Sequence, residues 1–244
     1  MRDQDGTARW GEGMRARLPA AVVAVVSAVV LTAGGCDAAG TEDADDAAGT
    51  GGTSGAPPES GTQLPGLPDA ATAADRLAAL TVAEPRAMTG YSRDRFPHWD
   101  SADGCTVRQT VLRRDGEDVT VDDDCRPVSG TWFSAYDGEE YTDDGDVDID
   151  HVVPLANAWR SGADAWTDDE RSAFANDLAQ PQLIAVGSRV NREKGDQAPD
   201  AWLPPAEEFG CTYALAWTTV KHAYELTVTT AERDRLAGLL GTCG

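Results

Sequence analysis

The chain has 244 residues, of which 20 are Lys or Arg and 42 are Asp or Glu, so its formal net charge at pH 7 is −22. Proteins that bind nucleic acid only through its phosphates usually have a basic surface overall, and so acidic a composition excludes that class. Residues 86–114 are the exception and are locally positive, with Arg86, Arg93, Arg95, Arg108, Arg113 and Arg114 against Asp94, Asp100 and Asp103.

The first 36 residues have the pattern of an export signal. Basic residues precede an apolar run at 18–31, which is too short to span a membrane comfortably, and small residues follow it. The segment 31–36, Leu-Thr-Ala-Gly-Gly-Cys, resembles a bacterial lipobox, although Ala33 stands where Leu is usual. The resemblance implies that Cys36 is lipidated and anchors an exported protein at the cell surface. The alternative is an ordinary signal peptide cleaved nearby, which would give a secreted protein.

Residues 37–68 contain several Asp and Glu but no Lys or Arg, and are otherwise rich in Gly, Ala, Thr and Pro. Such a segment cannot bury enough apolar surface to offset the entropy lost on ordering, so we expect a disordered acidic linker. Residues 69–244 then form one domain, which is long enough for a single core.

The domain is predicted to be α+β, with an N-terminal hairpin and with helices gathered toward the C-terminus. No internal repeat is present. In chain order we expect a helix at 69–80, an ordered loop at 91–100, a hairpin from 106–113 and 119–121, strands at 131–136 and 147–153, helices at 155–159 and 168–178, a strand at 183–186, a helix or turn from Asn191 that Gly195 ends, a helix at 212–226, and a last helix to 240 that starts at a capping box at Thr229.

Cys36 leaves four further cysteines, which can pair among themselves in three ways. Export places them in an oxidising compartment, where disulfides persist. We prefer Cys105–Cys125 and Cys211–Cys243 because these pairs close the shortest loops, and the first would join the open end of the expected hairpin. The alternative, a zinc site, lacks the usual CxxC or His-rich spacing.

The strongest functional signal is a carboxylate beside an imidazole at the end of a β-branched strand. Asp150 and His151 occupy that position, Pro154 stops the strand, and a polar cluster with Asn191 and Lys194 follows about forty residues later. Oxygen ligands for a hard cation, next to a neutral base, are what a metal-dependent phosphodiesterase needs to activate water.

These segments together resemble the ββα-metal motif of HNH endonucleases, with a motif core at 146–196. The resemblance is greatest to secreted HNH proteins, and it rests on Asp-His-Val-Val-Pro-Leu at 150–155, Ala-Asn-Asp at 175–177, Asn-x-x-Lys-Gly-Asp at 191–196 and Trp-Leu-Pro-Pro at 202–205. It implies that Asp150 and Asn191 hold a divalent metal ion, Mg²⁺ first, with Mn²⁺ or another first-row metal as alternatives. It further implies that His151 is the general base and that Lys194 contacts phosphate.

One position departs from the family pattern. HNH proteins carry a middle Asn that holds the loop next to the base, and its usual spacing falls here on Gln182, whereas Asn176 fits the secreted proteins better. Either residue is a candidate for this supporting role. Asp146 and Asp148 alternate with Asp150 and could share its strand face, and we interpret them as solvated.

Arg93, Arg95 and Arg192 are candidates for gripping the phosphate backbone, with the neighbouring aromatic residues available for stacking. The simpler interpretation of His98 and Trp99, which we favour, is an ordered loop packed on the core. Apart from the N-terminal lipid anchor in the membrane, the expected partner is nucleic acid, DNA before RNA, and no protein partner is evident.

We therefore expect a metal-dependent HNH-type endonuclease that acts outside the cytoplasm. The competing hypotheses are a non-catalytic surface lipoprotein that keeps the scaffold for binding, and a hydrolase that acts on another phosphodiester.

Overall fold

The computed structural model describes residues 64–102 and 104–243. The expected signal segment, Cys36 and most of the expected linker lie outside these residues. Helices occupy Ala70–Ala79 (α1), Val107–Asp115 (α2), Leu155–Arg160 (α3), Asp168–Ala175 (α4), Ser188–Lys194 (α5), Gly210–Ala223 (α6) and Thr230–Leu240 (α7). Strands occupy Ser101–Ala102 (β1), Cys105–Thr106 (β2), Gly116–Val121 (β3), Pro127–Ser134 (β4), Glu139–Tyr141 (β5), Val147–His151 (β6) and Leu183–Gly187 (β7).

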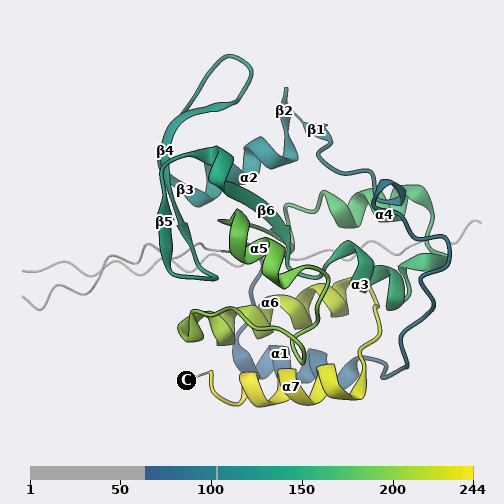
Figure 1. The fold of residues 1–244 in the computed structure, drawn as a ribbon. Helices are drawn as coiled ribbons and strands as arrows, with labels where there is room; N and C mark the ends of the chain where they lie inside the picture. Colours follow the sequence, from purple (N-terminus) through teal and green to yellow (C-terminus); the bar gives the residue numbers. More distant parts are fainter. Residues whose placement is uncertain (1–63, 103, 244) are drawn as a thin grey trace, which may run out of the picture. The chain divides into compact units, whose positions relative to one another are not determined.

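The predicted α+β class is confirmed. Figure 1 shows the long helices α1, α6 and α7 together at one end, the sheet β3–β4–β5 at the other, and β6 with α5 between them. β6 and β7 form a separate two-stranded antiparallel sheet. Among the described residues, no helix is both long enough and apolar enough to cross a membrane.

Reciprocal capping starts three of the helices. Thr106 with Gln109, Thr167 with Glu170, and Thr229 with Glu232 each form a capping box, in which the two residues satisfy each other's backbone N–H groups. The box at Thr229 and the start of α4 at Thr167 agree with the sequence prediction.

The expected hairpin at 106–113 and 119–121 is wrong in its first strand. Residues 107–115 form α2, because the Thr106 box initiates a helix and Val107, Val111 and Leu112 share its buried face. The hairpin is formed instead by β3 and β4, which pair antiparallel with irregular register.

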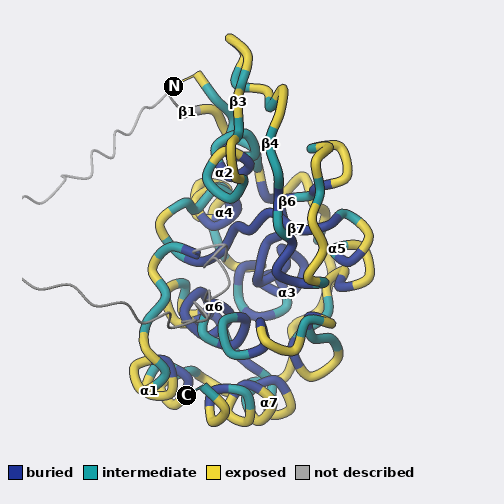
Figure 2. The backbone as a smooth tube through the Cα atoms, turned by 90° about the vertical axis from the view of Figure 1, so that its left-hand side faces the viewer, coloured by how far each residue is buried: buried dark blue, intermediate teal, exposed yellow. Residues whose placement is uncertain are grey.

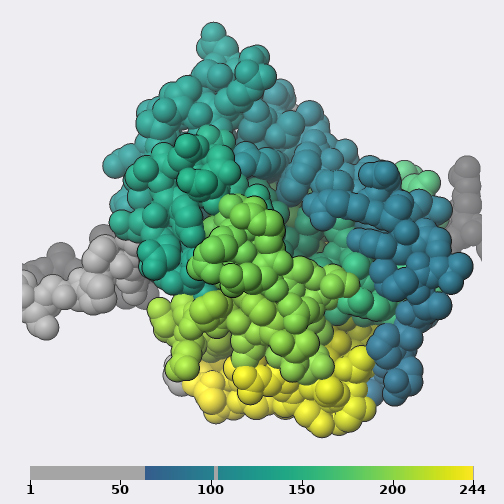
Figure 3. Space-filling view, viewed as in Figure 1, coloured from purple at the N-terminus to yellow at the C-terminus, as the bar shows by residue number. Residues whose placement is uncertain are grey.

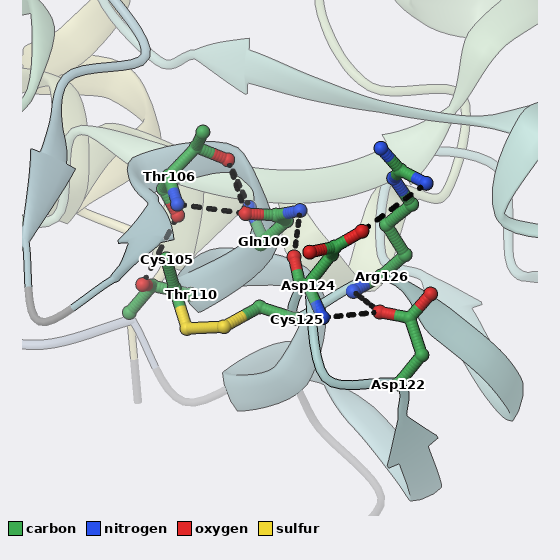
Figure 4. The surroundings of a disulfide bond; sticks show 8 residues. All are labelled: Cys105, Thr106, Gln109, Thr110, Asp122, Asp124, Cys125 and Arg126. Carbon is green, nitrogen blue, oxygen red and sulfur yellow. Dashed lines mark hydrogen bonds and ion pairs between the residues drawn. A yellow bond between two sulfur atoms is a disulfide. The ribbon is translucent and has the colours of Figure 1, made fainter.

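Both preferred disulfides are present, Cys105–Cys125 and Cys211–Cys243. Figure 4 shows that the first joins the residue before the α2 cap to the β3–β4 turn, where Gln109 also donates from Nε2 to the carbonyl of Asp124, at 2.9 Å. This disulfide therefore ties a helix start to a hairpin tip and does not close the expected strand pair.

Burial is densest where β6, β7, α3 and α6 meet (Figure 2). The main core surrounds Tyr213 and Trp217 of α6 and includes Leu64, the first described residue. A smaller core joins α2 and Trp132 to the β6–β7 sheet. All five residues of β7 are buried.

Side chains from the end of α2 cover the free edge of β7. The Arg114 guanidinium donates to the carbonyl of Leu183, and the Asp115 carboxylate accepts from the amide of Ala185. An unpaired strand edge is thereby satisfied inside the domain. The β6–β7 sheet is consequently a fixed platform for the residues at its end.

α5 follows β7 without a loop and begins at Ser188. Asn191 consequently lies in the middle of this helix and not at its start, which corrects the sequence expectation. Gly195 ends the helix with a positive φ of 56°, a conformation that favours glycine.

Candidate active site

The order strand, strand, helix expected around Asp150 and His151 is present in β6, β7 and α5. The antiparallel register places Asp150 opposite Ile184 and His151 opposite Leu183. α3 and α4 are inserted between the two strands, so the three parts of the motif are assembled by tertiary structure. Figure 3 shows the bright-green segment that includes α5 at the surface of this face of the protein.

A cleft of about 250 Å³ opens at the junction of β6, α3 and α5. It brings Asp150, His151 and Asn191 together, as the sequence predicts. Arg93 and Arg192 also line it, whereas Arg95 does not; Arg95 instead pairs with Asp168 and lies over the Trp159 ring. Two of the three candidate phosphate-binding arginines therefore face this cleft.

His151 is nearly buried and its ring has a defined tautomer. Nε2 lies 2.8 Å from the carbonyl oxygen of Ala175, at the end of α4. Because a carbonyl can only accept, Nε2 carries the proton, and the lone pair of the neutral ring is on Nδ1. Burial lowers the pKa of His151 to about 3, so the ring is neutral near pH 7. A neutral imidazole with a free Nδ1 lone pair is a proton acceptor.

Asp150 is buried and already has polar partners. Oδ2 accepts from the hydroxyl of Tyr136 at 2.7 Å, and the ammonium of Lys194 lies 2.9 Å from Oδ1 and 2.8 Å from Oδ2. Burial raises the pKa of Asp150, and the Lys194 charge opposes that rise. The carboxylate is thus one half of an internal ion pair.

The position of Lys194 corrects the expectation that it contacts phosphate. Its side chain is fully buried, and its ammonium donates to Asp150 and to the carbonyl of His151, at 2.9 Å. Residues three apart on a helix share a face, as expected for Asn191 and Lys194, but the longer Lys side chain extends into the protein interior.

Asn191 has one carboxylate partner, and it is not Asp150. Its Nδ2 donates to Oδ2 of Asp148 at 3.1 Å. The sequence interpretation of Asp148 as solvated is therefore incomplete, because this residue of β6 contacts a candidate metal ligand on α5. The alternation of Asp148 with Asp150 on one strand was the signal that could have identified it.

Gln182 and Asn176 both hold backbone near the base, in different places. The fully buried amide of Gln182 accepts from the N–H of Val153 at 3.1 Å and donates to its carbonyl at 2.9 Å. Asn176 donates to the carbonyl of Pro97 and accepts from the N–H of Asp100. Gln182 fixes the chain just after His151, and Asn176 fixes the loop that carries His98 and Trp99.

That loop places two residues, His98 and Trp99, beside the base, whereas the interpretation favoured from the sequence is packing on the core. The rings of His98 and Trp99 lie 6.4 and 5.7 Å from the His151 ring, between centroids. Trp99 has a φ of 65°, rare for a large side chain. Arg93 donates to Nε2 of His98 at 3.3 Å. The sequence signal for these residues is the aromatic and basic cluster itself, some fifty residues before His151, and nothing in it points to a contact with the base.

The donors facing the cleft suit a hard divalent cation at Asn191 better than at Asp150. The Asn191 amide uses only its nitrogen in the bond to Asp148, so its oxygen is available as a ligand. Within residues 64–102 and 104–243, no group of three His, Cys, Asp or Glu side chains is arranged to hold a metal ion. A cation here would rest on few protein ligands and keep several waters, as Mg²⁺ often does.

Comparison with known families gives an independent result. Residues 110–239, more than half of the chain, match the family model described as "GmrSD restriction endonucleases, C-terminal domain". The chain belongs to this family. The GmrSD C-terminal domain region contains β6, β7 and α5 with Asp150, His151 and Asn191, while Arg93 and His98 precede it. The domain is therefore nuclease-like.

A relative of this GmrSD-type chain is a protein of Arthroderma benhamiae named "Uncharacterized secreted protein". The two are 54% identical over 180 residues, which cover 73% of this chain and 88% of the relative. No solved structure matches the chain.

Proposed function

We propose that this protein is a metal-dependent endonuclease of the HNH type, which hydrolyses phosphodiester bonds of nucleic acid. The observation that carries the proposal is His151, a neutral imidazole whose Nε2–H is fixed by the carbonyl of Ala175 and whose Nδ1 makes no hydrogen bond with the described residues, at a cleft that also contains Asn191. Membership of a restriction-endonuclease domain family supports the same reaction class.

In the proposed mechanism, Nδ1 of His151 takes a proton from the attacking water. The cation, Mg²⁺ first and Mn²⁺ as an alternative, would be held through the Asn191 oxygen and would stabilise charge on the phosphate oxygens. The resemblance to HNH endonucleases implies Asp150 as a second ligand, but this carboxylate already forms an ion pair with Lys194. Trp99 and His98 pack beside the imidazole and limit its motion.

Arg93 and Arg192 are the proposed phosphate contacts, because both line the cleft and both are largely exposed. With a net charge of −22, the rest of the chain repels a polyanion, so affinity should depend on this local positive patch and fall steeply with salt. DNA is the favoured substrate, and RNA is the alternative, tested by incubating the protein with an RNA substrate under the same conditions.

The direct test is nicking of plasmid DNA by the purified protein with Mg²⁺ or Mn²⁺, with and without chelator. Replacing His151 by Ala should lower the rate by about 10²–10⁴-fold, the usual contribution of a general base. His222→Ala is the matched control, because His222 is exposed on α6 and should leave the rate unchanged. Equal nicking by wild type and His151→Ala would remove the catalytic assignment, and binding without cleavage would favour the non-catalytic lipoprotein.

We also propose that the protein acts outside the cytoplasm. The printed name of the Arthroderma relative includes "secreted", and the signal-like N-terminus of this chain agrees with export. Lipidation of Cys36 is a separate proposal. Cys36→Ala should release the protein from membranes into the medium, and continued membrane retention would count against the anchor.

A further inference from the structure

We propose that Asp150 is a positioning residue and not a metal ligand: with Lys194 and Tyr136 it forms a buried polar triad that holds the His151 backbone. The metal ligand that the protein supplies is then the side-chain oxygen of Asn191, and Asp148 orients that side chain. This inference rests on the proposed metal-dependent function and concerns which residues serve it.

The first argument is the occupancy of the carboxylate. An ionised carboxylate offers about four acceptor positions. Lys194 approaches both oxygens of Asp150, and Tyr136 donates to one of them, so three contacts of 2.7–2.9 Å are already made. Asp150 is only 6% exposed, and Lys194 is fully buried. Little of this carboxylate remains for a hydrated cation.

The second argument is charge. The Lys194 ammonium neutralises Asp150 from inside the protein, and a divalent cation on the same oxygens would lie close to that ammonium. In a buried site such repulsion is weakly screened. A cation therefore binds more favourably at an oxygen that is not already paired with an ammonium.

The third argument is what the triad does hold. Lys194, in the last turn of α5, donates both to Asp150 and to the carbonyl of His151, so one ammonium joins the helix to the end of β6. Tyr136 is fixed from the other side by the rings of Trp202, Phe209 and Tyr213, at 5.4–5.8 Å between centroids. The Trp202 segment thereby supports the base residue through Tyr136 and Asp150.

The fourth argument concerns Asn191. Its Nδ2 donates to Asp148, which leaves Oδ1 as the atom available to a cation. Asp148 is half-buried and two residues before Asp150 on β6, and Asn191 is its one side-chain partner among the described residues. A carboxylate that fixes the orientation of a ligand is a common arrangement around metal sites.

The test measures metal affinity separately from activity, and so distinguishes whether Asp150 is a metal ligand or a positioning residue. Asp150→Asn and Lys194→Met each leave a buried charge without its partner and should destabilise the fold, whereas the double variant removes both charges and should recover much of the stability. We expect the double variant to bind Mn²⁺ within about threefold of wild type, while its kcat falls at least tenfold with little change in KM. Asn191→Ala should weaken Mn²⁺ binding at least tenfold.

A folded double variant that loses Mn²⁺ affinity tenfold or more would overturn the proposal, because Asp150 would then be a ligand. Tyr136→Phe is the second variant, which removes one hydroxyl and keeps both charges. It should lower kcat several-fold with unchanged Mn²⁺ affinity, and an unchanged kcat would also overturn the proposal.

Failure of the underlying function gives a different pattern. Wild-type protein that binds Mn²⁺ but cleaves no nucleic acid contradicts the nuclease proposal and leaves the comparison of Mn²⁺ affinities valid. Wild-type protein that binds no Mn²⁺ overturns both.

Discussion

The buried amide of Gln182 provides the sharpest test of how the base is held in place. Gln182→Met keeps the size and flexibility of the side chain but removes both polar atoms. The N–H and the carbonyl of Val153, bonded at 3.1 and 2.9 Å, then remain buried without partners. Each such group costs about 1–3 kcal/mol, so we expect a loss of about 2–6 kcal/mol in the free energy of unfolding.

The assay is urea unfolding followed by tryptophan fluorescence, with the free energy obtained by linear extrapolation. Gln180→Met is the control, because the Gln180 side chain is partly exposed and makes no hydrogen bond with the described residues; it should change stability by less than about 0.5 kcal/mol. Since Val153 is two residues from His151, kcat should also fall in Gln182→Met. A loss below about 0.5 kcal/mol would refute the role of this amide.

Three further outcomes follow. Burial lowers the pKa of His151 from 6.5 to about 3, so only the unfolded chain gains a proton as the pH falls below 6.5. The contribution of His151 to the free energy of unfolding is complete above pH 6.5, and about 3 kcal/mol of it is lost by pH 4. His151→Gln should therefore make the free energy of unfolding less dependent on pH between 6.5 and 4. Equal pH dependence in wild type and variant would contradict the burial argument. Asn176→Ala should speed hydrogen exchange of the Asp100 amide, whose acceptor it removes, and unchanged protection would count against that contact. Replacing Cys211 and Cys243 by Ser opens a loop of 32 residues and should lower the free energy of unfolding, measured by thermal unfolding, by about 3–4 kcal/mol. A change near zero would mean that α6 and α7 hold the C-terminus without the disulfide.

The sequence predicted correctly those helices and strands whose formation depends on residues close together in the chain. The capping box at Thr229, the strand before His151 and the apolar run of β7 all depend on neighbours in sequence, and the structure contains them. Loop length alone selected the disulfide pairs that are present. The same kind of signal was overlooked at Thr106, where a capping box with Gln109 begins a helix in a segment rich in β-branched residues.

Tertiary contacts decided what the sequence left open. Whether Lys194 reaches outward to a phosphate or inward to a carboxylate depends on how α5 packs on β6, and the spacing from Asn191 is the same in both cases. The role of Asp148 required the position of Asn191, 43 residues away. Trp99 lies beside His151 on a loop that Asn176 helps to fix, a contact between two segments that show no shared sequence pattern.

The carbonyl of Ala175 belongs to the stretch that interrupts the two paired strands, and it determines which imidazole nitrogen holds the proton. A minimal peptide made by joining β6, β7 and α5 through a short turn would keep the ligand and the base in sequence but lose that acceptor. Its histidine would be free to exchange tautomers and rotate. Transplanting this chemistry to another scaffold therefore requires α4 as well.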